Sequence, residues 1–385
     1  MSMLEWGLIG GGEGSIIGGA HVVGARMDGQ FTLAAGAVDI DPERGRDYAC
    51  RLGVAADRAY GDWRSMLAGE LARPEGDRVS LVTIATPNST HYEIASAFLE
   101  AGIHVLCEKP MTTMVEDAEA LVEIAARTGR ICAVNYVYSG YPMAREMRAM
   151  VARGDLGRVR VVNTEFAHSF LADPSNDFPG WRFDPAQAGV SAIVGDCGVH
   201  ALHLASFVVG QEVERLTADF ARCVEGRELE DDALVAFRMS GGTVGRLWTS
   251  AVAVGHSHGL RIQVFGERGG LAWDQEQPNQ LYWTPLGEST RRLERGAEGL
   301  SPESTRASRM MLIGHPEGFL EGFANIYADL AEEIVARREG RPPAPAATWW
   351  PTTEDGLRSV AAVHAAVESN RREGAWVDAR PPSLR

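Results

Sequence analysis

The chain has 385 residues, of which 45% are apolar and 23% are charged, so it can bury a large core and is long enough for two domains. Its formal net charge of −15 disfavours nucleic acid and acidic membrane surfaces as partners, because both are polyanions. The five cysteines are widely spaced without a C-x-x-C pair, and neither a leader nor a membrane-length apolar run is found. We therefore expect a cytoplasmic protein that binds a small molecule and holds no metal.

A glycine-rich turn follows the first predicted strand, Trp6 to Gly10, and leads into a segment with helical periodicity. Strand, glycine turn and helix in this order can bind a dinucleotide, because glycines let the backbone approach the pyrophosphate and the helix terminus supplies N–H donors. Gly10 and Gly12 fit the first two positions of G-x-G-x-x-G, but the third is best matched by Gly18, so Glu13 to Ser15 form an insertion. The alternative is a plain tight turn. The dinucleotide interpretation assigns Gly10, Gly12, Ser15, Ile16 and Ile17 to the cofactor site.

Two aspartates follow the second predicted strand, Thr32 to Val38. An acidic side chain here accepts hydrogen bonds from the adenosine ribose and repels a 2′-phosphate, which favours NAD over NADP. Either aspartate could instead cap the next helix, which Pro42 can begin. Asp41, directly before Pro42, suits the cap, and this leaves Asp39 for the ribose.

Further strand–helix alternation predicts a doubly wound parallel sheet, and we assign residues 1–138 to this α/β domain. The carboxyl edge of such a sheet is where ligands bind. Seven polar or turn residues are expected at this edge: Thr86, Pro87, Asn88, His91, Glu108, Lys109 and Asn135. Pro110 biases Lys109 toward an extended backbone, which would aim its ammonium group outward. The alternative is that Glu108 and Lys109 are simply the polar end of a strand.

Residues 139–385 predict a second α/β domain with a large, open and mostly antiparallel sheet, because long alternating segments are joined by hairpin turns. Helices are expected on one face of this sheet, and a second copy of the chain would cover the other economically. We therefore expect a homodimer or homotetramer. The segment 284–311, rich in Arg, Glu, Ser and Gly, is expected to be a mobile excursion.

Asp196 and His200 are four residues apart in the predicted helix Val190 to Val209, so they should share one helix face. A carboxylate placed in this way can orient an imidazole and stabilise its protonated form, although a structural pair is the commoner case. Other aromatic or polar residues could line a sugar site or be ordinary packing and surface groups: Tyr136, Tyr138, His168, Trp181, Arg182 and His315.

With these residues identified, the chain resembles the Gfo/Idh/MocA family of sugar and inositol oxidoreductases over nearly its whole length. The resemblance rests on the glycine loop, Ala85 to Asn88, Glu108-Lys109-Pro110, Trp181-Arg182 and Gly195 to His200, in this order. It implies a Rossmann domain, a second domain with an open sheet, bound NAD or NADP, and catalysis by Lys109, Asp196 and His200 at the nicotinamide. The lengthened glycine loop departs from the family pattern, as does the segment Tyr136 to Pro142, where many members carry a basic residue.

Three functions are compatible with this resemblance. The first is an NAD-dependent dehydrogenase that removes hydride from a secondary hydroxyl, expected at C3, of a pyranose, glycoside or cyclitol. The second resembles the NAD-dependent sulfoquinovosidases, which are glycosidases that oxidise C3 transiently, eliminate and reduce again, with Tyr136, Tyr138 or His168 as a further base. The third, an NAD-binding regulator without catalysis, is disfavoured because Lys109, Asp196 and His200 are all present.

Overall fold

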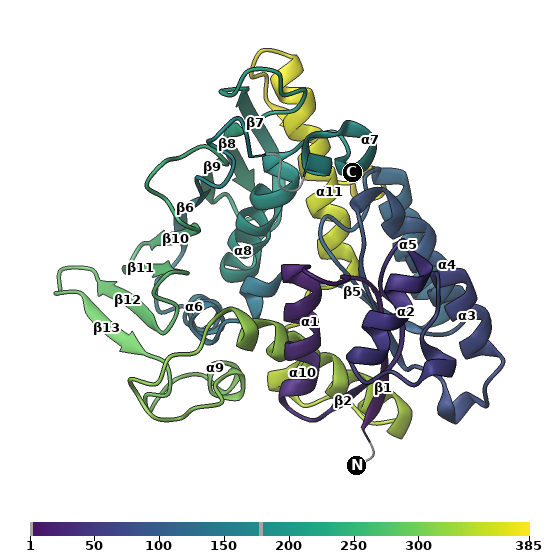
Figure 1. Ribbon diagram of the computed structural model, residues 1–385. Coiled ribbons are helices and arrows are strands. Elements are labelled where there is room, and N and C mark those ends of the chain that lie inside the picture. Colours follow the sequence, from purple (N-terminus) through teal and green to yellow (C-terminus); the bar gives the residue numbers. More distant parts are fainter. Residues whose placement is uncertain (1–2, 177–179) are drawn as a thin grey trace. The chain divides into compact units, whose positions relative to one another are not determined.

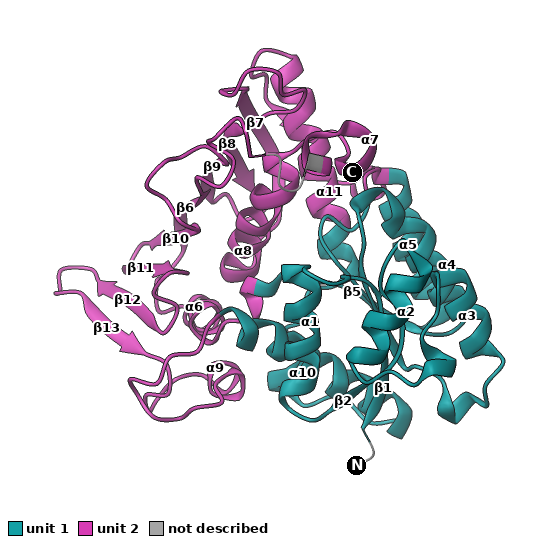
Figure 2. Cartoon of the chain, in the orientation of Figure 1, with its two compact units in different colours: residues 1–112, 116–137, 319–356 teal, residues 113–115, 138–318, 357–385 magenta. Residues whose placement is uncertain are grey.

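The structure is a computed structural model that describes residues 3–176 and 180–385 (Figure 1). The chain forms two compact units (Figure 2). The first contains the residues up to 112, 116–137 and 319–356, and the second contains 113–115, 138–318 and 357–385.

The first unit is built on a five-stranded parallel sheet with the strand order β2-β1-β3-β4-β5. Its strands are β1 (Leu4–Gly10), β2 (Phe31–Ala37), β3 (Leu81–Ala85), β4 (His104–Cys107) and β5 (Cys132–Val134). Its helices are α1 (Ile16–Met27), α2 (Pro42–Arg51), α3 (Trp63–Leu71), α4 (His91–Glu100), α5 (Val115–Thr128) and α10 (Phe319–Glu339). Strands β3, β4 and β5 are short and almost wholly buried, as expected for a parallel sheet covered on both faces. The predicted Rossmann domain is confirmed.

Helix α10 returns to the first unit after the chain has completed most of the second. It packs against α1 and contributes Ile326, Tyr327 and Leu330 to the core that also holds Trp6 and Phe31. The ring of Tyr327 meets those of Trp6 and Phe31 edge-on, each at 5.6 Å between centroids. Residues 319–356 therefore belong with the amino-terminal unit, whereas the sequence alone had suggested one boundary near residue 138.

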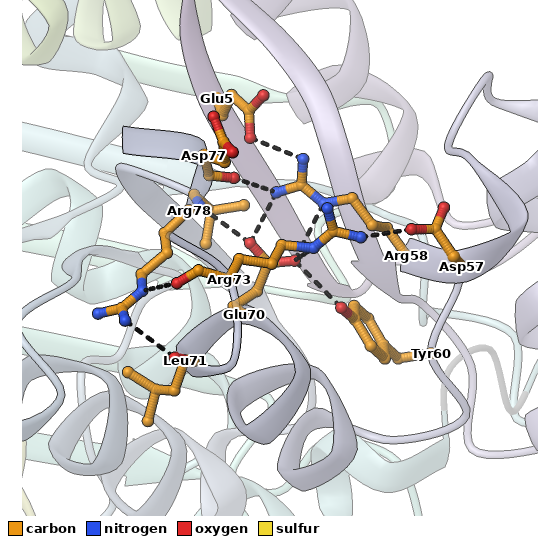
Figure 3. Close-up of polar contacts among 10 residues, drawn as sticks. Glu5, Asp57, Arg58, Tyr60, Glu70, Leu71, Arg73, Asp77 and Arg78 are labelled. Atoms are coloured by element: carbon orange, nitrogen blue, oxygen red, sulfur yellow. Dashed lines mark hydrogen bonds and ion pairs between the residues drawn. The ribbon is translucent and has the colours of Figure 1, made fainter. Parts of the chain in front are cut away.

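A buried ionic cluster secures the amino edge of the parallel sheet (Figure 3). The carboxylate of Glu70, on α3, is fully buried and accepts hydrogen bonds from Arg58 Nε at 3.0 Å and Nη2 at 2.6 Å. It also accepts from the Tyr60 hydroxyl at 3.2 Å and from the Val79 N–H, just before β3, at 3.0 Å. Arg58 Nη1 lies 2.6 Å from Glu5 Oε2 at the start of β1, so the cluster ties α3 to two strands.

The second unit is built on a nine-stranded sheet with the order β13-β12-β11-β10-β6-β9-β8-β7-β14. Its strands are β6 (Val159–Ala167), β7 (Val213–Ala221), β8 (Asp232–Met239), β9 (Val244–Ser250), β10 (Gly259–Gly266), β11 (Gly269–Asp274), β12 (Gln280–Pro285), β13 (Arg291–Glu294) and β14 (Val377–Asp378). Its helices are α6 (Pro142–Ala152), α7 (Pro185–Ala188), α8 (Val199–Val209), α9 (Pro302–Ala307) and most of α11 (Thr353–Arg371). Neighbouring strands are antiparallel except β6 and β9, so the predicted open sheet is confirmed.

The expected mobile excursion over 284–311 is wrong, because this segment contains the end of β12, all of β13 and helix α9. Cross-strand contacts explain why this segment forms regular structure. The guanidinium of Arg291 lies over the Trp283 ring at 5.1 Å, and the hydroxyls of Thr284 and Thr290 are 2.8 Å apart. Such pairs stabilise a hairpin even where the sequence is polar.

Candidate active site

The glycine turn between β1 and α1 brings backbone segments too close for side chains. Gly10 and Gly11 have φ values of +74° and +68°, in the left-handed region that favours glycine. A Cβ on Gly18 would lie 2.2 Å from the Gly11 carbonyl oxygen, and one on Gly10 would lie 2.5 Å from that of Ala85. Gly18 therefore occupies the close-packing position at the start of α1, with the inserted residues between it and Gly12.

The inserted residues have structural partners of their own. Ser15 caps α1 by accepting a hydrogen bond from the Gly18 N–H at 3.0 Å. Both carboxylate oxygens of Glu13 bind Arg51 of α2, at 2.7 and 2.6 Å. Ile16 and Ile17 begin the helix, and Ile16 is 69% exposed, so this helix end is accessible.

The two aspartates after β2 have separate tasks. Asp41 caps α2 and accepts hydrogen bonds from the N–H groups of Glu43 and Arg44. Asp39 accepts from Arg44 Nε at 2.8 Å and Nη2 at 2.6 Å. These hydrogen bonds hold the pKa of Asp39 below its usual range and outweigh the opposing effect of its burial. A Cβ on Gly12 would lie 3.0 Å from Asp39 Oδ2, so the glycine turn and this carboxylate are neighbours.

At the end of β4, the buried carboxylate of Glu108 collects several donors. Its Oε1 lies 2.6 Å from Asn135 Nδ2 and 3.0 Å from His21 Nε2. Its Oε2 lies 3.3 Å from the backbone nitrogen of Lys109, which is joined to Pro110 by a cis peptide bond. Burial acts to raise the pKa of Glu108, but its interactions with His21, the charge of Lys109 and the hydrogen bond from Asn135 lower it overall. Glu108 is therefore a carboxylate beside Lys109.

His91 connects two loops of the same sheet edge. Its Nδ1 lies 2.9 Å from the Pro110 carbonyl oxygen and its Nε2 lies 2.9 Å from that of Thr86. Burial lowers the pKa of this imidazole. Pro87 and the buried Asn88 follow Thr86, so the edge residues expected from the sequence lie in adjoining loops of one unit.

In the second unit, Asp196 lies in a π-helical turn, Val194–Gly198, and His200 lies in the first turn of α8. The expected continuous α-helix is therefore wrong at this point. The Val199 N–H bonds to the Val194 carbonyl five residues back, and the buried Glu230 accepts the N–H of Val194, so the turn is wider than an α-turn. Asp196 Oδ2 accepts a hydrogen bond from Arg182 Nε at 2.7 Å, and the Arg182 guanidinium lies over the Trp181 ring at 4.9 Å.

Imidazole and phenol groups gather around His200 in this unit. The Tyr138 ring meets the His200 ring edge-on at 4.9 Å, and the Tyr138 hydroxyl lies 2.9 Å from His258 Nε2. His168 is buried and its ring stacks on Phe170 at 4.7 Å and on His258 at 6.4 Å. His258 was missed in the sequence, although Gly255-His256-Ser257-His258-Gly259 is a glycine-flanked polar loop between two predicted strands.

Two further predicted substrate residues differ in burial. His315 is exposed in the loop between α9 and α10, and its carbonyl accepts a hydrogen bond from Arg295. Tyr136 is fully buried in the first unit just after β5. Within residues 3–176 and 180–385, no group of three His, Cys, Asp or Glu side chains could hold a metal ion. No helix in this described part of the chain is long and apolar enough to cross a membrane.

The parallel sheet, the glycine cradle and the acidic residue after β2 define an NAD-binding Rossmann domain, and a Cβ at Gly10, Gly12 or Gly18 would intrude on that cradle. Residues 4–136 match the model of the oxidoreductase family with an NAD-binding Rossmann fold, and residues 144–272 match that of the GFO/IDH/MocA C-terminal domain. The chain belongs to the Gfo/Idh/MocA family of oxidoreductases.

Several relatives span nearly the same length. The uncharacterized oxidoreductase YfiI of Bacillus subtilis (strain 168) is 35% identical over 382 residues, which cover 97% of this chain and 96% of the relative. An inositol dehydrogenase homolog from Azotobacter vinelandii, solved with NAD+, is 40% identical with a TM-score of 0.93 and covers 98% of this chain and 97% of its own. The homolog solved with NADH and myo-inositol gives 39% identity and a TM-score of 0.90, with 98% of each chain covered.

Proposed function

We propose that the protein is a dehydrogenase for a secondary hydroxyl of a cyclitol or a pyranose sugar, with C3 as the expected position in a pyranose. The observation that carries this proposal is the Glu108–Lys109 corner, where a buried carboxylate adjoins a lysine at the ligand edge of the NAD-binding sheet. The similarity to a homolog that binds NADH and myo-inositol supports the substrate class. NAD, when bound, supplies the hydride acceptor.

The proposed cofactor residues are those of the glycine cradle and the sheet edge. Gly10, Gly12, Ser15, Ile16 and Ile17 would hold the pyrophosphate, because α1 presents its amino end beside glycines that leave the backbone accessible. Asp39 would accept the ribose hydroxyls, which favours NAD over NADP. The remaining proposed residues line the same edge: Thr86, Pro87, Asn88, His91, Glu108, Lys109 and Asn135.

The proposed catalytic residues are Lys109, His200 and Asp196. His200 would take the proton of the reacting hydroxyl, and the Lys109 ammonium would stabilise the negative charge that develops on that oxygen. Asp196, paired with Arg182, would orient His200 or accept a hydrogen bond from a neighbouring substrate hydroxyl. Tyr136, Tyr138, His168, Trp181, Arg182 and His315 are the other proposed substrate residues, and the exposed position of His315 makes it the most peripheral of them.

The test is to incubate the purified protein with NAD+ and a panel of cyclitols and pyranoses, and to follow NADH by its absorbance. A placed acid or base contributes roughly 10² to 10⁴ in rate, so His200→Ala and Lys109→Met should each lose about that much. NADH titration of each variant separates loss of catalysis from loss of folding. Near-normal turnover by either variant contradicts its assignment. NADH binding without turnover on any polyol would instead favour a regulator.

A second candidate function is a glycosidase that recycles its NAD. It needs one more proton-transfer group than a dehydrogenase, and the hydrogen-bonded Tyr138 and His258 in ring contact with His200 offer one. In this reaction C3 would be oxidised, the C2 proton removed, the aglycone eliminated, water added and C3 reduced again. Glycoside cleavage with trace NAD+ and no net NADH would support it, and Tyr138→Phe should then abolish cleavage but spare oxidation. Stoichiometric NADH and an intact glycoside would support the dehydrogenase.

We also propose that the open face of the nine-stranded sheet forms a homodimer or homotetramer interface. One face of β6 is buried, whereas Asn163 and Glu165 point to the other, which carries a hollow of about 450 Å³. Trp248 and Tyr282 line the hollow, and Leu234, paired with Trp248 across β8 and β9, is 55% exposed. Light scattering should show a dimer or tetramer that Leu234→Arg dissociates. A monomeric wild-type protein at micromolar concentration would contradict the proposal.

A further inference from the structure

The core of the first unit contains a continuous chain of polar side chains that ends at Glu108 and whose other members have no part in the proposed reaction. Trp6 Nε1 lies 2.9 Å from Thr83 Oγ1, which lies 2.7 Å from the Tyr327 hydroxyl. That hydroxyl lies 2.9 Å from His21 Nδ1, and His21 Nε2 lies 3.0 Å from Glu108 Oε1. The side chains come from β1, β3, α10, α1 and the end of β4, and all belong to the first unit.

The two ends of this chain set the direction of its hydrogen bonds. The Trp6 indole can only donate, and the Glu108 carboxylate can only accept. If each hydroxyl donates one proton, Thr83 donates to Tyr327 and Tyr327 donates to His21 Nδ1. Nδ1 then carries no hydrogen, and Nε2 carries the one that His21 donates to Glu108. The opposite direction would put a proton on both ring nitrogens and form a buried imidazolium–carboxylate pair with Glu108, whose desolvation is costly.

We propose that His21 is a positioning residue, held as a neutral imidazole with its proton on Nε2, that fixes the carboxylate of Glu108 beside Lys109. The inference rests on the proposed role of the Glu108–Lys109 corner in the cofactor site. His21 acts through Glu108 and not on the cofactor or the substrate, because its side chain is fully buried and its ring packs edge-on against Phe323 at 4.9 Å. Tyr327 has the role of a tautomer selector, since its hydroxyl proton occupies the Nδ1 side of the ring.

Without the Nε2 donor, Glu108 Oε1 would lose its hydrogen bond from His21. Among the described side-chain contacts, it would keep only the hydrogen bond from the Asn135 amide. A buried carboxylate that loses a donor rotates toward other donors or takes up a proton, and either change alters what Oε2 presents to the Lys109 backbone. The expected result is a displaced Lys109 loop in a folded protein.

Two substitutions of His21 test the roles of its two ring nitrogens separately. His21→Gln places an amide nitrogen near the position of Nε2 and keeps a donor for Glu108. His21→Asn places its amide near Nδ1 and removes that donor. We expect His21→Gln to bind NADH within a few-fold of wild type and His21→Asn to bind about tenfold or more weakly, since an unmet buried partner typically costs that much. Melting temperatures of both variants control for folding.

The tautomer is read from the wild-type protein by NMR with ¹⁵N-labelled histidine, and the His21 signals are those absent from the spectrum of His21→Gln. One unprotonated Nδ1 and one protonated Nε2 are expected, and Tyr327→Phe should let the proton redistribute between the two nitrogens. Protonation of Nδ1 in the wild type, or equal NADH binding by the Gln and Asn variants, overturns the proposal. Neither readout needs a substrate. A protein that passes both but oxidises no polyol would refute the proposed function and leave the role of His21 intact.

Discussion

Replacing Glu70 by Gln tests how much the buried ionic cluster contributes to the stability of the NAD-binding unit. The substitution keeps the volume and removes only the charge, so Arg58 retains Glu5 as its one remaining carboxylate partner in the cluster shown in Figure 3. Burial opposes the charge of Arg58, but the hydrogen bonds to Glu70 and Glu5 outweigh it and raise the pKa of the guanidinium. Glu70→Gln removes part of this effect, but a guanidinium is not deprotonated in proteins, so Arg58 stays charged in the variant.

Breaking a buried ion pair costs about 3 to 5 kcal/mol, and we expect the lower end because Glu5 remains. About 3 kcal/mol corresponds to a fall of roughly 6 to 12 °C in the melting temperature of a unit of this size. Differential scanning calorimetry with and without NADH identifies the transition of the NAD-binding unit, because bound ligand raises it.

Glu93→Gln is the matched control, since Glu93 and its partner Arg64 have side chains that are 61% and 63% exposed. Exposed pairs of this kind contribute little, so the control should melt like the wild type. If Glu70→Gln also melted like the wild type, or if both variants lost stability equally, burial would not be the reason that the cluster stabilises the NAD-binding unit.

Three further predictions concern the same unit. Gly18→Ala should abolish NADH binding, since its Cβ would meet the Gly11 carbonyl oxygen at 2.2 Å. Gly19→Ala, whose Cβ would have nothing within 4 Å, should be tolerated and stabilise α1 by up to about 1 kcal/mol. Equal NADH binding by the two variants would refute the packing argument. Asp39→Ala frees Arg44 for a 2′-phosphate and should shift the ratio of NADH to NADPH affinity by about tenfold toward NADPH. Asp41→Ala should only weaken the cap of α2. Fluorescence titration with both cofactors measures the ratio, and an unchanged ratio in Asp39→Ala counts against the ribose role. Burial, with three nearby arginines, lowers the pKa of His104 to about 3, and its Nδ1 accepts the Ile131 N–H. Below about pH 6.5 the unfolded histidine binds a proton that the folded one refuses, so stability should fall by about 1.4 kcal/mol per pH unit on acidification. His104→Asn should flatten the dependence of the melting temperature on pH between about 6.5 and 5, and an unchanged slope would exclude His104 as its source.

The alternation of apolar segments predicted both sheets, because buried parallel strands and half-exposed antiparallel strands leave different patterns in the sequence. The position of α10 could not be predicted in this way. Its apolar face fits any core, and only the three-dimensional packing of Tyr327 against Trp6 and Phe31 shows which core it completes. Strand β13 could not be predicted either, because it is stabilised by cross-strand contacts such as that of the Arg291 guanidinium with the Trp283 ring, which a polar sequence does not reveal.

The glycine cradle and the edge residues after β3 and β4 were predictable, since each follows a recognisable strand. The partners of those residues were not. His21 and Tyr327 are 306 positions apart, and Arg182 pairs with Asp196 in a π-helical turn that the sequence pattern did not indicate. Long-range pairs of this kind depend on the final packing, whereas motifs depend on local geometry.

The return of α10 to the NAD-binding unit also constrains how the protein is made. A ribosome releases residues up to 137 long before it reaches Ile326, Tyr327 and Leu330, so the early chain lacks part of its own hydrophobic core. The NAD-binding unit can be completed only after strands β6 to β13 of the second sheet have been synthesised. Its folding is therefore largely post-translational, and residues 1–137 expressed alone would be an unfinished domain with an exposed apolar surface.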